Sequence, residues 1–454
     1  MKYLYLQLAY ALLFASYSCS DLIEIDPPKT ELIRATVFAE DAAALSAMAG
    51  VYATLANSNH YLINSFGGIH QLTGLTADEY DFIYTVSGFA ENDIDPTNPH
   101  VMEVWSSSYG VIYRCNVILE ALERNEALST AVKQQLEGES RFLRALSYFY
   151  LVNVFGDVPL LLHSDFEHNA LAPRTATDLV YSQVEDDLRI AAGLLPRDFG
   201  LAAGQRVRAC HWAARALLAR VYAYTERWDQ VEIETSAIIS HQALFKLAES
   251  LDDIFLANSE EAILQFYPLP SMSDNAAEAF ESYTNATEIG ISTLSSHLCE
   301  AFEEGDRRFE LWIGNRQDYA YATKYKARLY NAPAFTEYTT FLRLGEQYLL
   351  RAEARAHLGD FAGGSSDLGA IRQRSGLAEV TRYSRNELME AVIQERRVEL
   401  FAEFGHRWFD LKRWGLADQL LQNIKPGWDS GDLLFPIPQN EINKNPNLIQ
   451  NEGY

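Results

Sequence analysis

One short stretch of the sequence gathers residue types that are common in active sites. From Glu395 to Gly415 the chain reads ERRVELFAEFGHRWFDLKRWG, with acids, bases and one histidine among aromatic rings. Residues of these types can act as general acids and bases. His406, however, follows Gly405, where the helical pattern pauses, and the sequence supplies it with no partnered nucleophile. A lone histidine in this setting is more often a structural hydrogen-bonding residue than a catalytic one.

The spacing within this stretch favours architecture over chemistry. Glu403 and Arg407 stand one helical turn apart, where opposite charges form a favourable pair. The charged residues would therefore line the flanks of a buried stripe, and we predict a scaffold with no catalytic residue. The stripe consists of four apolar residues at helical intervals: Leu400, Phe401, Phe404 and Trp408.

Two other polar clusters have compositions that a metal ion could use. His163 and His168, in HSDFEH, lack a third spaced ligand for zinc. The segment ENDIDP, residues 91–96, offers oxygen ligands but not the order of a known calcium loop. The sequence also contains no phosphate-binding glycine loop, dinucleotide fingerprint or hydrolase motif. We therefore predict no metal and no cofactor, whereas paired carboxylates for glycoside hydrolysis would be identified only by their separation in space.

The elements that must position these residues are mostly helical. Residues 139–155, ESRFLRALSYFYLVNVF, predict a helix with one buried face. Residues 42–55 and 105–122 are suited to a first helix pair. The buried face of the 139–155 helix carries apolar residues at spacings of three and four: Phe142, Ala145, Leu146, Phe149 and Val152.

Two further segments, 216–239 and 349–371, resemble each other at a single offset of 133 residues without a gap. Small residues one helical turn apart let a partner helix approach closely, and a bulky ring fills the turn, as in tetratricopeptide hairpins. The sequence therefore predicts about four such helix pairs. The matched positions are Ala219 with Ala352, Ala223 with Ala356, and Trp228 with Phe361.

Long stretches rich in Gly, Asn, Asp and Tyr interrupt the helical pattern. The two longest are Asn64 to Val104 and Tyr267 to Tyr338, and both exceed a simple connection in a compact domain. We expect these irregular insertions to carry function, because binding residues concentrate in such segments.

Composition and charge exclude several classes of protein. The chain has 454 residues and 48% hydrophobic content, which is enough for a substantial core. Its 37 basic and 62 acidic residues give a formal net charge of −25, which repels nucleic acid and anionic membranes. The 25 Tyr, 23 Phe and 7 Trp residues suit a binding surface as well as a core. We predict no nucleic-acid partner.

The amino terminus has the pattern of an export signal. A positive Lys2 precedes a largely apolar run from Tyr3 to Phe14, and small residues follow up to Cys19. Cys19 looks like the lipid-attachment site of a bacterial lipoprotein, although bulky Tyr17 departs from the usual pattern. We predict residues 1–18 as a signal peptide and contact with the membrane through the lipid anchor only. A cleaved signal without lipid is the alternative.

Several separated motifs resemble the SusD/RagB family of outer-membrane nutrient-binding lipoproteins. The carboxyl-terminal ones are EQYLLRAEARAHLGD, AIRQRSGL, ERRVELFAEFGHRWFDLKRWG and LFPIPQNEINKNPNLIQNEGY. Earlier ones, in the same order as in the family, are DPPKTEL, WSSSYGVIYRCNVIL and RFLRALSYFYLVNVFGDVPLLL. The resemblance spans nearly the whole chain.

This resemblance implies a mainly α-helical fold with four tetratricopeptide-like pairs and a second, irregular lobe. Residues 19–454 would form a single SusD-like domain, with an N-terminal part at about 19–230 and a C-terminal SusD/RagB part at about 260–454. It further implies a non-enzymatic surface lipoprotein of the outer membrane. Such a protein captures glycans for a SusC-like TonB-dependent transporter. A peptide receptor of the same fold and a glycoside hydrolase are the alternatives.

For a glycan ligand, the insertions offer aromatic rings beside polar side chains. Sugar C–H faces lie on rings, and sugar hydroxyls bond to carboxylates, amides and arginine. In TADEYDFIYTVSGFAEND, every second residue from Asp78 to Tyr84 is a candidate: Asp78, Tyr80, Phe82 and Tyr84. In a β-strand, side chains at this spacing point to the same face of the sheet. We predict these four as ligand residues, with the buried face of a strand as the alternative for each ring.

The second insertion repeats this pattern in LWIGNRQDYAYATKYKARLY. Trp312 precedes a polar turn, after which Tyr319, Tyr321 and Tyr325 alternate. We predict Trp312, Tyr319 and Tyr321 as further ligand residues, again with burial as the alternative. Four polar residues elsewhere complete the candidates, with helix capping or an ion pair as their alternative role: Asn57, Asn59, Arg372 and Arg374.

Overall fold

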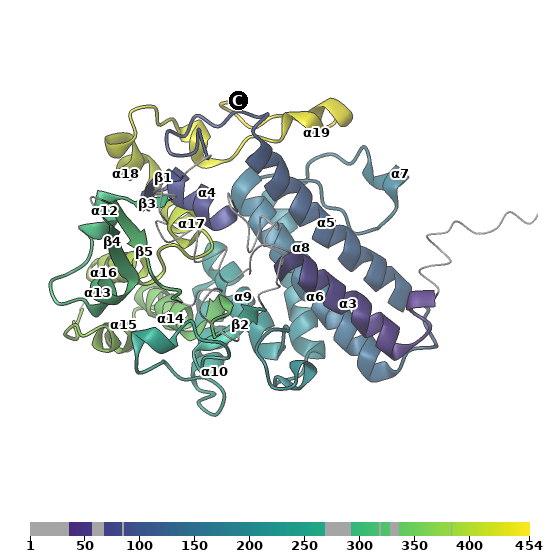
Figure 1. The fold of residues 1–454 in the computed structure, drawn as a ribbon, viewed down its shortest axis with the longest axis horizontal. Helices are drawn as coiled ribbons and strands as arrows, with labels where there is room; N and C mark the ends of the chain where they lie inside the picture. Colours follow the sequence, from purple (N-terminus) through teal and green to yellow (C-terminus); the bar gives the residue numbers. More distant parts are fainter. Residues whose placement is uncertain are drawn as a thin grey trace, which may run out of the picture.

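The chain is mainly helical, as the sequence predicts (Figure 1). The computed structural model describes residues 36–56, 68–83, 86–267, 292–316, 319–326, 336–382 and 384–454, without the side chains of Ile83 and Arg316. Most of the short strands of this described part lie at one end of the molecule, and the longest helices lie at the other (Figure 1).

The long α6 is the centre of the helical half. It contacts α3, α5 and α8. The five residues of the predicted face are buried, but so is nearly every other residue from 138 to 155, so this part of the helix is buried on all sides and not along one face. Ser129 caps the first turn of α6, and Gly156 ends it with a positive φ of 72°, which glycine adopts at little cost. The four helices are α3 (Asp41–Ala56), α5 (Pro99–Leu122), α6 (Thr130–Phe155) and α8 (Thr177–Leu194).

Two helical hairpins follow the predicted offset of 133 residues. Helix α14 begins 133 residues after α9, at 344 and 211, and α15 begins 133 residues after α10, at 361 and 228. The matched alanines are buried, and the Trp228 ring stacks on His357 at 3.9 Å between centroids, which joins the hairpins where α10 contacts α14. The helices are α9 (His211–Tyr224), α10 (Trp228–Ile239), α14 (Leu344–Leu358) and α15 (Phe361–Arg374).

The two long insertions meet in a lobe of short strands, as expected. Strand β1 from the first insertion pairs with β3 from the second, and β4 pairs with β5. A third antiparallel pair, β2 with β6, connects this lobe to the helices. The strands are β1 (Tyr80–Ile83), β2 (Ala262–Phe266), β3 (Ser292–Leu294), β4 (Ile313–Arg316), β5 (Tyr319–Ala322) and β6 (Thr339–Arg343).

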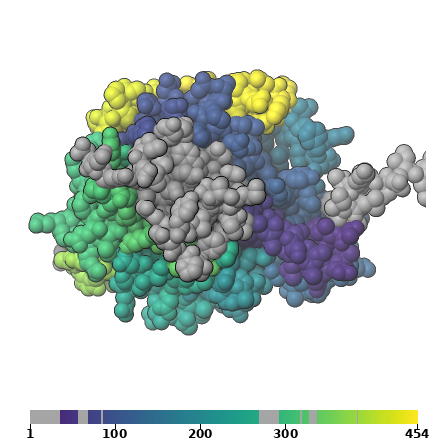
Figure 2. All heavy atoms as spheres, viewed as in Figure 1, coloured from purple at the N-terminus to yellow at the C-terminus, as the bar shows by residue number. Residues whose placement is uncertain are grey.

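The remaining α-helices, most of them short, complete the strand lobe and the C-terminal part. They are α4 (Ile69–Thr76), α7 (Phe166–Asn169), α12 (Ser296–Cys299), α13 (Arg307–Trp312), α16 (Arg385–Glu399), α17 (His406–Arg413), α18 (Ala417–Ile424) and α19 (Gln439–Lys444). The C-terminal residues lie beside the segment before α5, where the Gln439 amide donates to the Pro96 carbonyl at 2.9 Å (Figure 2).

The predicted ion pair between Glu403 and Arg407 is wrong. Helix α16 ends at Glu399 and α17 begins at His406, so the two residues do not share a helical face. Three residues with positive φ make this break, namely Ala402, Phe404 and Gly405, and only the last is a glycine. Each charged residue therefore finds a partner elsewhere in the chain.

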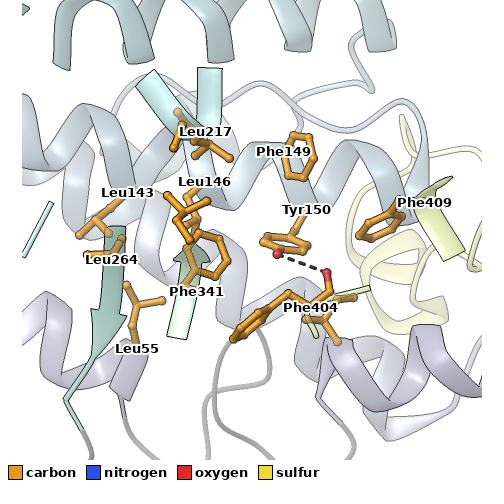
Figure 3. Packing of buried hydrophobic residues seen from close by; sticks show 14 of the residues in the cluster. Leu55, Leu143, Leu146, Phe149, Tyr150, Leu217, Leu264, Phe341, Phe404 and Phe409 are labelled. Atoms are coloured by element: carbon orange, nitrogen blue, oxygen red, sulfur yellow. Dashed lines mark hydrogen bonds between the residues drawn. The ribbon is translucent and has the colours of Figure 1, made fainter. Parts of the chain in front are cut away.

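The apolar stripe of this stretch is nevertheless buried, as predicted. Figure 3 shows Phe404 and Phe409 beside Tyr150 of α6, whose hydroxyl donates to the Phe404 carbonyl. The same core includes Phe341 of β6. The broken segment between α16 and α17 is thus held against the central helix.

Within the described residues, no helix is both long enough and apolar enough to cross a membrane.

Candidate functional site

Exposed aromatic rings gather on the strand lobe. Phe82 on β1 and Tyr319 on β5 are 49% and 50% exposed, and Tyr321 on β5 is half-buried. Strand β3 contacts both β1 and β5, which brings these predicted ring positions into one region. We call Phe82, Tyr319 and Tyr321 the strand face. Large rings that remain half in water on strands with a common neighbour are suited to a flat apolar surface of a ligand.

Tyr80 was predicted to share this face but is buried. The register of β1 against β3 shifts between Tyr80 and Phe82, so the two side chains do not keep the simple alternation of a strand. The Tyr80 ring lies against Gly74, where an added Cβ would come within 2.6 Å of the ring. Burial raises the pKa of the Tyr80 hydroxyl well above its usual value. The ring is therefore part of the core.

Asp78 is also buried and serves as an ion-pair partner instead of a ligand residue. Arg407 donates to both of its carboxylate oxygens at 2.6 and 2.9 Å, and Arg397 donates to one of them at 2.6 Å. Burial alone would raise the pKa of Asp78, but the two guanidinium groups outweigh it and lower the pKa. Both oxygens are thus engaged within the protein.

Trp312 is fully buried, so its predicted role as a sugar platform is wrong. Its ring lies near Phe255 and Phe401, at centroid distances of 5.8 and 6.3 Å. The Lys324 ammonium sits 4.6 Å from the ring centroid, which adds a cation–π contact. Tyr325 is buried beside Phe255 as well, beyond the end of β5.

Arg372 and Arg374 take the alternative role of ion-pair residues. Arg372 donates to Glu303 and Glu395, and Arg374 donates to Glu261 and Glu399. Both arginines are buried, so they are wrong as ligand candidates. Four further predictions lie outside the described residues: Asn57, Asn59, Tyr84 and the lipidation site Cys19.

The stretch that first suggested an active site contributes to a buried ion cluster. Glu399 accepts from Arg308 at 2.9 Å and from Arg343 at 2.7 Å, and Arg343 also donates to Glu403 at 2.8 Å. Burial would raise the pKa of Glu399, yet the surrounding guanidinium groups lower it strongly. We define the buried ion cluster as Glu261, Arg308, Lys324, Arg343, Arg374, Glu399 and Glu403.

His406 lies under this cluster and is not suited to catalysis. It is buried, and burial together with the neighbouring arginines lowers its pKa well below the usual value. Such an imidazole stays neutral and cannot be reached by a substrate. The prediction of scaffold for this stretch agrees with that geometry.

A small charged cavity lies next to β1. It has a volume of about 290 Å³ and is lined by Asp78 and Arg397 together with His297 and Glu300 near α12. The Arg397 Nε atom is buried without a hydrogen-bond partner among the described residues, so it could donate to a ligand hydroxyl. Sequence reasoning missed Arg397, His297 and Glu300, because nothing in their local pattern separates them from surface or scaffold residues.

Two adjacent carboxyls near this cavity have pKa values moved in opposite directions, which is a common feature of acid–base catalysts. Burial, and then the charge of Asp78, raises the pKa of Glu79 to about 8. Glu79 is buried, however, and both oxygens of Asp78 accept from arginines. Neither carboxyl is available to a substrate, so this pair is not placed for hydrolysis.

The clusters considered for metals offer no complete ligand set. Among the described residues, no group of three or more His, Cys, Asp and Glu side chains is placed to hold a metal ion. The rings of His163 and His168 meet edge to face at 6.0 Å between centroids. The Asp95 carboxylate accepts from the amide and hydroxyl of Thr97 in a local turn.

The described residues thus define a mainly helical protein with a ring-bearing strand lobe. Its sequence matches two family models: "SusD family" over residues 323–454 and "Starch-binding associating with outer membrane" over residues 30–223. The chain belongs to the SusD/RagB family. The second model describes a family that associates with the outer membrane.

Known relatives are similar to this chain along most of its length. A SusD-like protein of Formosa agariphila is 24% identical over 98% of this chain and 98% of its own. The starch-binding protein SusD of Bacteroides thetaiotaomicron is 24% identical over 73% of this chain and 75% of its own. A solved structure described as a laminarin-binding SusD-like protein superposes with a TM-score of 0.78, at 25% identity, over 91% of this chain and 99% of its own. The fold is that of the SusD superfamily.

Proposed function

We propose that the protein is a non-enzymatic receptor for oligo- or polysaccharides, and that the strand face is part of its binding site. The observation that carries this proposal is the placement of two half-exposed rings, Phe82 and Tyr319, on β1 and β5, which both contact β3. The charged cavity lies next to α12, the helix that follows β3 in the chain. Rings take up the C–H faces of a sugar, and the Arg397 guanidinium and the Glu300 carboxylate, which line the charged cavity, can bond its hydroxyls.

Family membership supports the ligand class. One relative is named for starch and one similar structure for laminarin, both of which are uncharged glucans. An uncharged ligand also suits a chain with a formal net charge of −25, which would repel polyanions. The specific sugar and linkage would depend on the detailed shape of the strand face.

The proposal extends to location and partner. We infer that Cys19 carries a lipid, that the protein is held at the cell surface of the outer membrane, and that it delivers glycan to a SusC-like TonB-dependent transporter. The support is the signal-like amino terminus and the family resemblance. A pull-down of the lipidated protein from outer membranes should recover such a transporter, and recovery of the protein alone would contradict the partnership.

Ring substitutions test the site. Phe82→Ala and Tyr319→Ala should each weaken glycan binding about five- to tenfold, because each removes an aromatic contact. The thermal midpoint should barely move, since both rings are half exposed. Ile233→Ala on α10 is the matched control, because Ile233 is also an exposed apolar residue. Unchanged affinity in both ring variants would exclude the strand face as the binding site.

A further inference from the structure

A second and larger cavity lies in the helical half of the molecule, away from the strands. It has a volume of about 590 Å³, within the range of about 300–1,000 Å³ that is typical of small-ligand sites. Its walls come from α5, from the segment 159–172 that includes α7, and from the C-terminal residues around α19. Figure 1 shows α5, α7 and α19 on the side opposite β1, β3, β4 and β5.

Two exposed rings from different elements line this cavity. Tyr113 of α5 is 55% exposed, and Phe166 of α7 is 81% exposed. A phenylalanine that is exposed to water lacks the stabilisation that burial would supply. Folding therefore does not explain why Phe166 is exposed at the wall of a cavity, whereas ligand binding would. The rings can contact the two sides of a flat ligand that enters between α5 and α7.

The floor of the cavity is fixed. Trp105 is buried and lies 5.0 Å from Tyr109 and 5.1 Å from Phe155, measured between ring centroids. The Tyr109 hydroxyl donates to the Pro159 carbonyl at 2.8 Å. The Asn116 side chain donates to the Leu161 carbonyl at 2.9 Å. The polar groups of the floor are thus used to hold α5 against segment 159–172, which leaves an apolar surface facing the cavity.

The loop that carries Phe166 is also held in place. Ser164 donates through its amide and its hydroxyl to the Glu120 carboxylate of α5. Asp165 caps α7 by accepting from the Glu167 and His168 amides. The Asn169 amide group donates to the His163 carbonyl at 2.7 Å. A ligand would therefore meet a pre-organised ring, which lowers the entropy cost of binding.

A few polar atoms in the cavity remain available. The Asn169 Oδ1 atom is buried without a hydrogen-bond partner among the described residues, so it can accept from a ligand hydroxyl. At the rim, Glu441 and Lys444 of α19 form an ion pair at 2.8 Å, and the lysine side chain is largely exposed. The cavity thus combines rings, an amide acceptor and one balanced pair of charges.

We propose that this cavity is a second carbohydrate-binding site, which takes a short, uncharged oligosaccharide between the rings of Tyr113 and Phe166. Balanced charges disfavour a phosphate or a carboxylate ligand, and isolated polar atoms beside apolar walls suit a sugar ring with its C–H faces and hydroxyls. The ligand class rests on the proposed function of the chain. Two sites on opposite sides of the molecule would allow one polysaccharide chain or two separate chains to be held at once.

The test uses three forms of the full chain with Cys19→Ser: the parent, the strand-face variant Phe82→Ala/Tyr319→Ala, and the cavity variant Tyr113→Ala/Phe166→Ala. Each is titrated calorimetrically with short oligosaccharides of the glycan class that the parent binds. We expect two sites per parent molecule and one site in each variant. Phe166→Tyr keeps a ring and is the matched control, which should retain both sites.

The outcomes separate the two proposals. Loss of the second site in the cavity variant, with an unchanged thermal midpoint, supports the cavity site. A parent that binds glycan at one site, with no change in the cavity variant, overturns the cavity site and leaves the receptor function intact. A parent that binds no glycan overturns the receptor function and with it the sugar ligand of the cavity. Peptide binding that requires Phe166 would show that the cavity takes peptide, which also contradicts the sugar proposal.

Discussion

Aromatic rings of the insertions lie both on the strand face and beside the buried ion cluster, and the two settings have opposite properties. In the cluster every charge that we name meets an opposite charge within the protein, and rings such as Trp312 are buried beneath them. On the strand face Phe82 and Tyr319 remain half in water. The types of residue present therefore do not identify a binding site by themselves. A binding site is identified by groups that remain accessible and unpaired within the protein.

The largest effect should come from breaking the buried ion cluster. Arg343→Met removes the donor that joins Glu399 and Glu403, and leaves both buried carboxylates with one fewer opposite charge. We expect the free energy of unfolding to fall by about 3–5 kcal/mol. Denaturant unfolding measures this change, and Lys246→Met, which breaks the exposed pair with Glu260, is the control with little effect. Equal effects in both variants would show that the cluster is not a structural core.

A smaller set of changes compares two rings. Trp312→Ala should cost about 3–5 kcal/mol of unfolding free energy, because it opens a cavity in a packed core. Tyr319→Ala should cost no more than about 0.5 kcal/mol, because half of its ring already faces water. Guanidinium unfolding of both variants tests the difference. A mild effect of Trp312→Ala would mean that the ring is accessible after all.

The pH dependence of stability should reveal Glu79. Its folded pKa of about 8 lies above its ordinary value of 4.5, so the folded state holds a proton that the unfolded state releases between these values. The contribution of Glu79 to stability therefore declines as pH rises from about 4.5 to about 8. Glu79→Gln keeps a neutral side chain, so its thermal midpoint relative to wild type should be higher at pH 8.5 than at pH 5.

The control for this prediction is Glu260→Gln, because Glu260 is exposed and pairs with Lys246 at the surface. Its midpoint relative to wild type should be nearly the same at both pH values. If Glu79→Gln also gives a constant difference, the carboxyl is ionised in the folded protein and its burial is compensated by another group.

Much of the helical fold could be predicted because its causes are local. The periodicity of residues 139–155 predicts the helix α6, although this part of it is buried on all sides, and the offset of 133 residues locates both later hairpins. The break between α16 and α17 was harder to predict from the sequence. Gly405 marks its end, but Ala402 and Phe404 also adopt positive φ, which their residue types do not suggest.

The candidate sites could be predicted only in part, because exposure depends on packing between distant segments. Tyr80 and Phe82 look equivalent in sequence, yet the register shift against β3 buries one and exposes the other. The helical cavity has no local pattern at all. Its walls come from α5, segment 159–172 and α19, which meet only in the folded chain.

The most direct test of the receptor function is a binding screen of the Cys19→Ser protein against immobilised polysaccharides, with a parallel assay for released reducing ends. We expect retention on one class of uncharged glycan and no release of sugar. Release of reducing ends would show an enzyme, and absence of retention on every glycan would contradict a carbohydrate receptor.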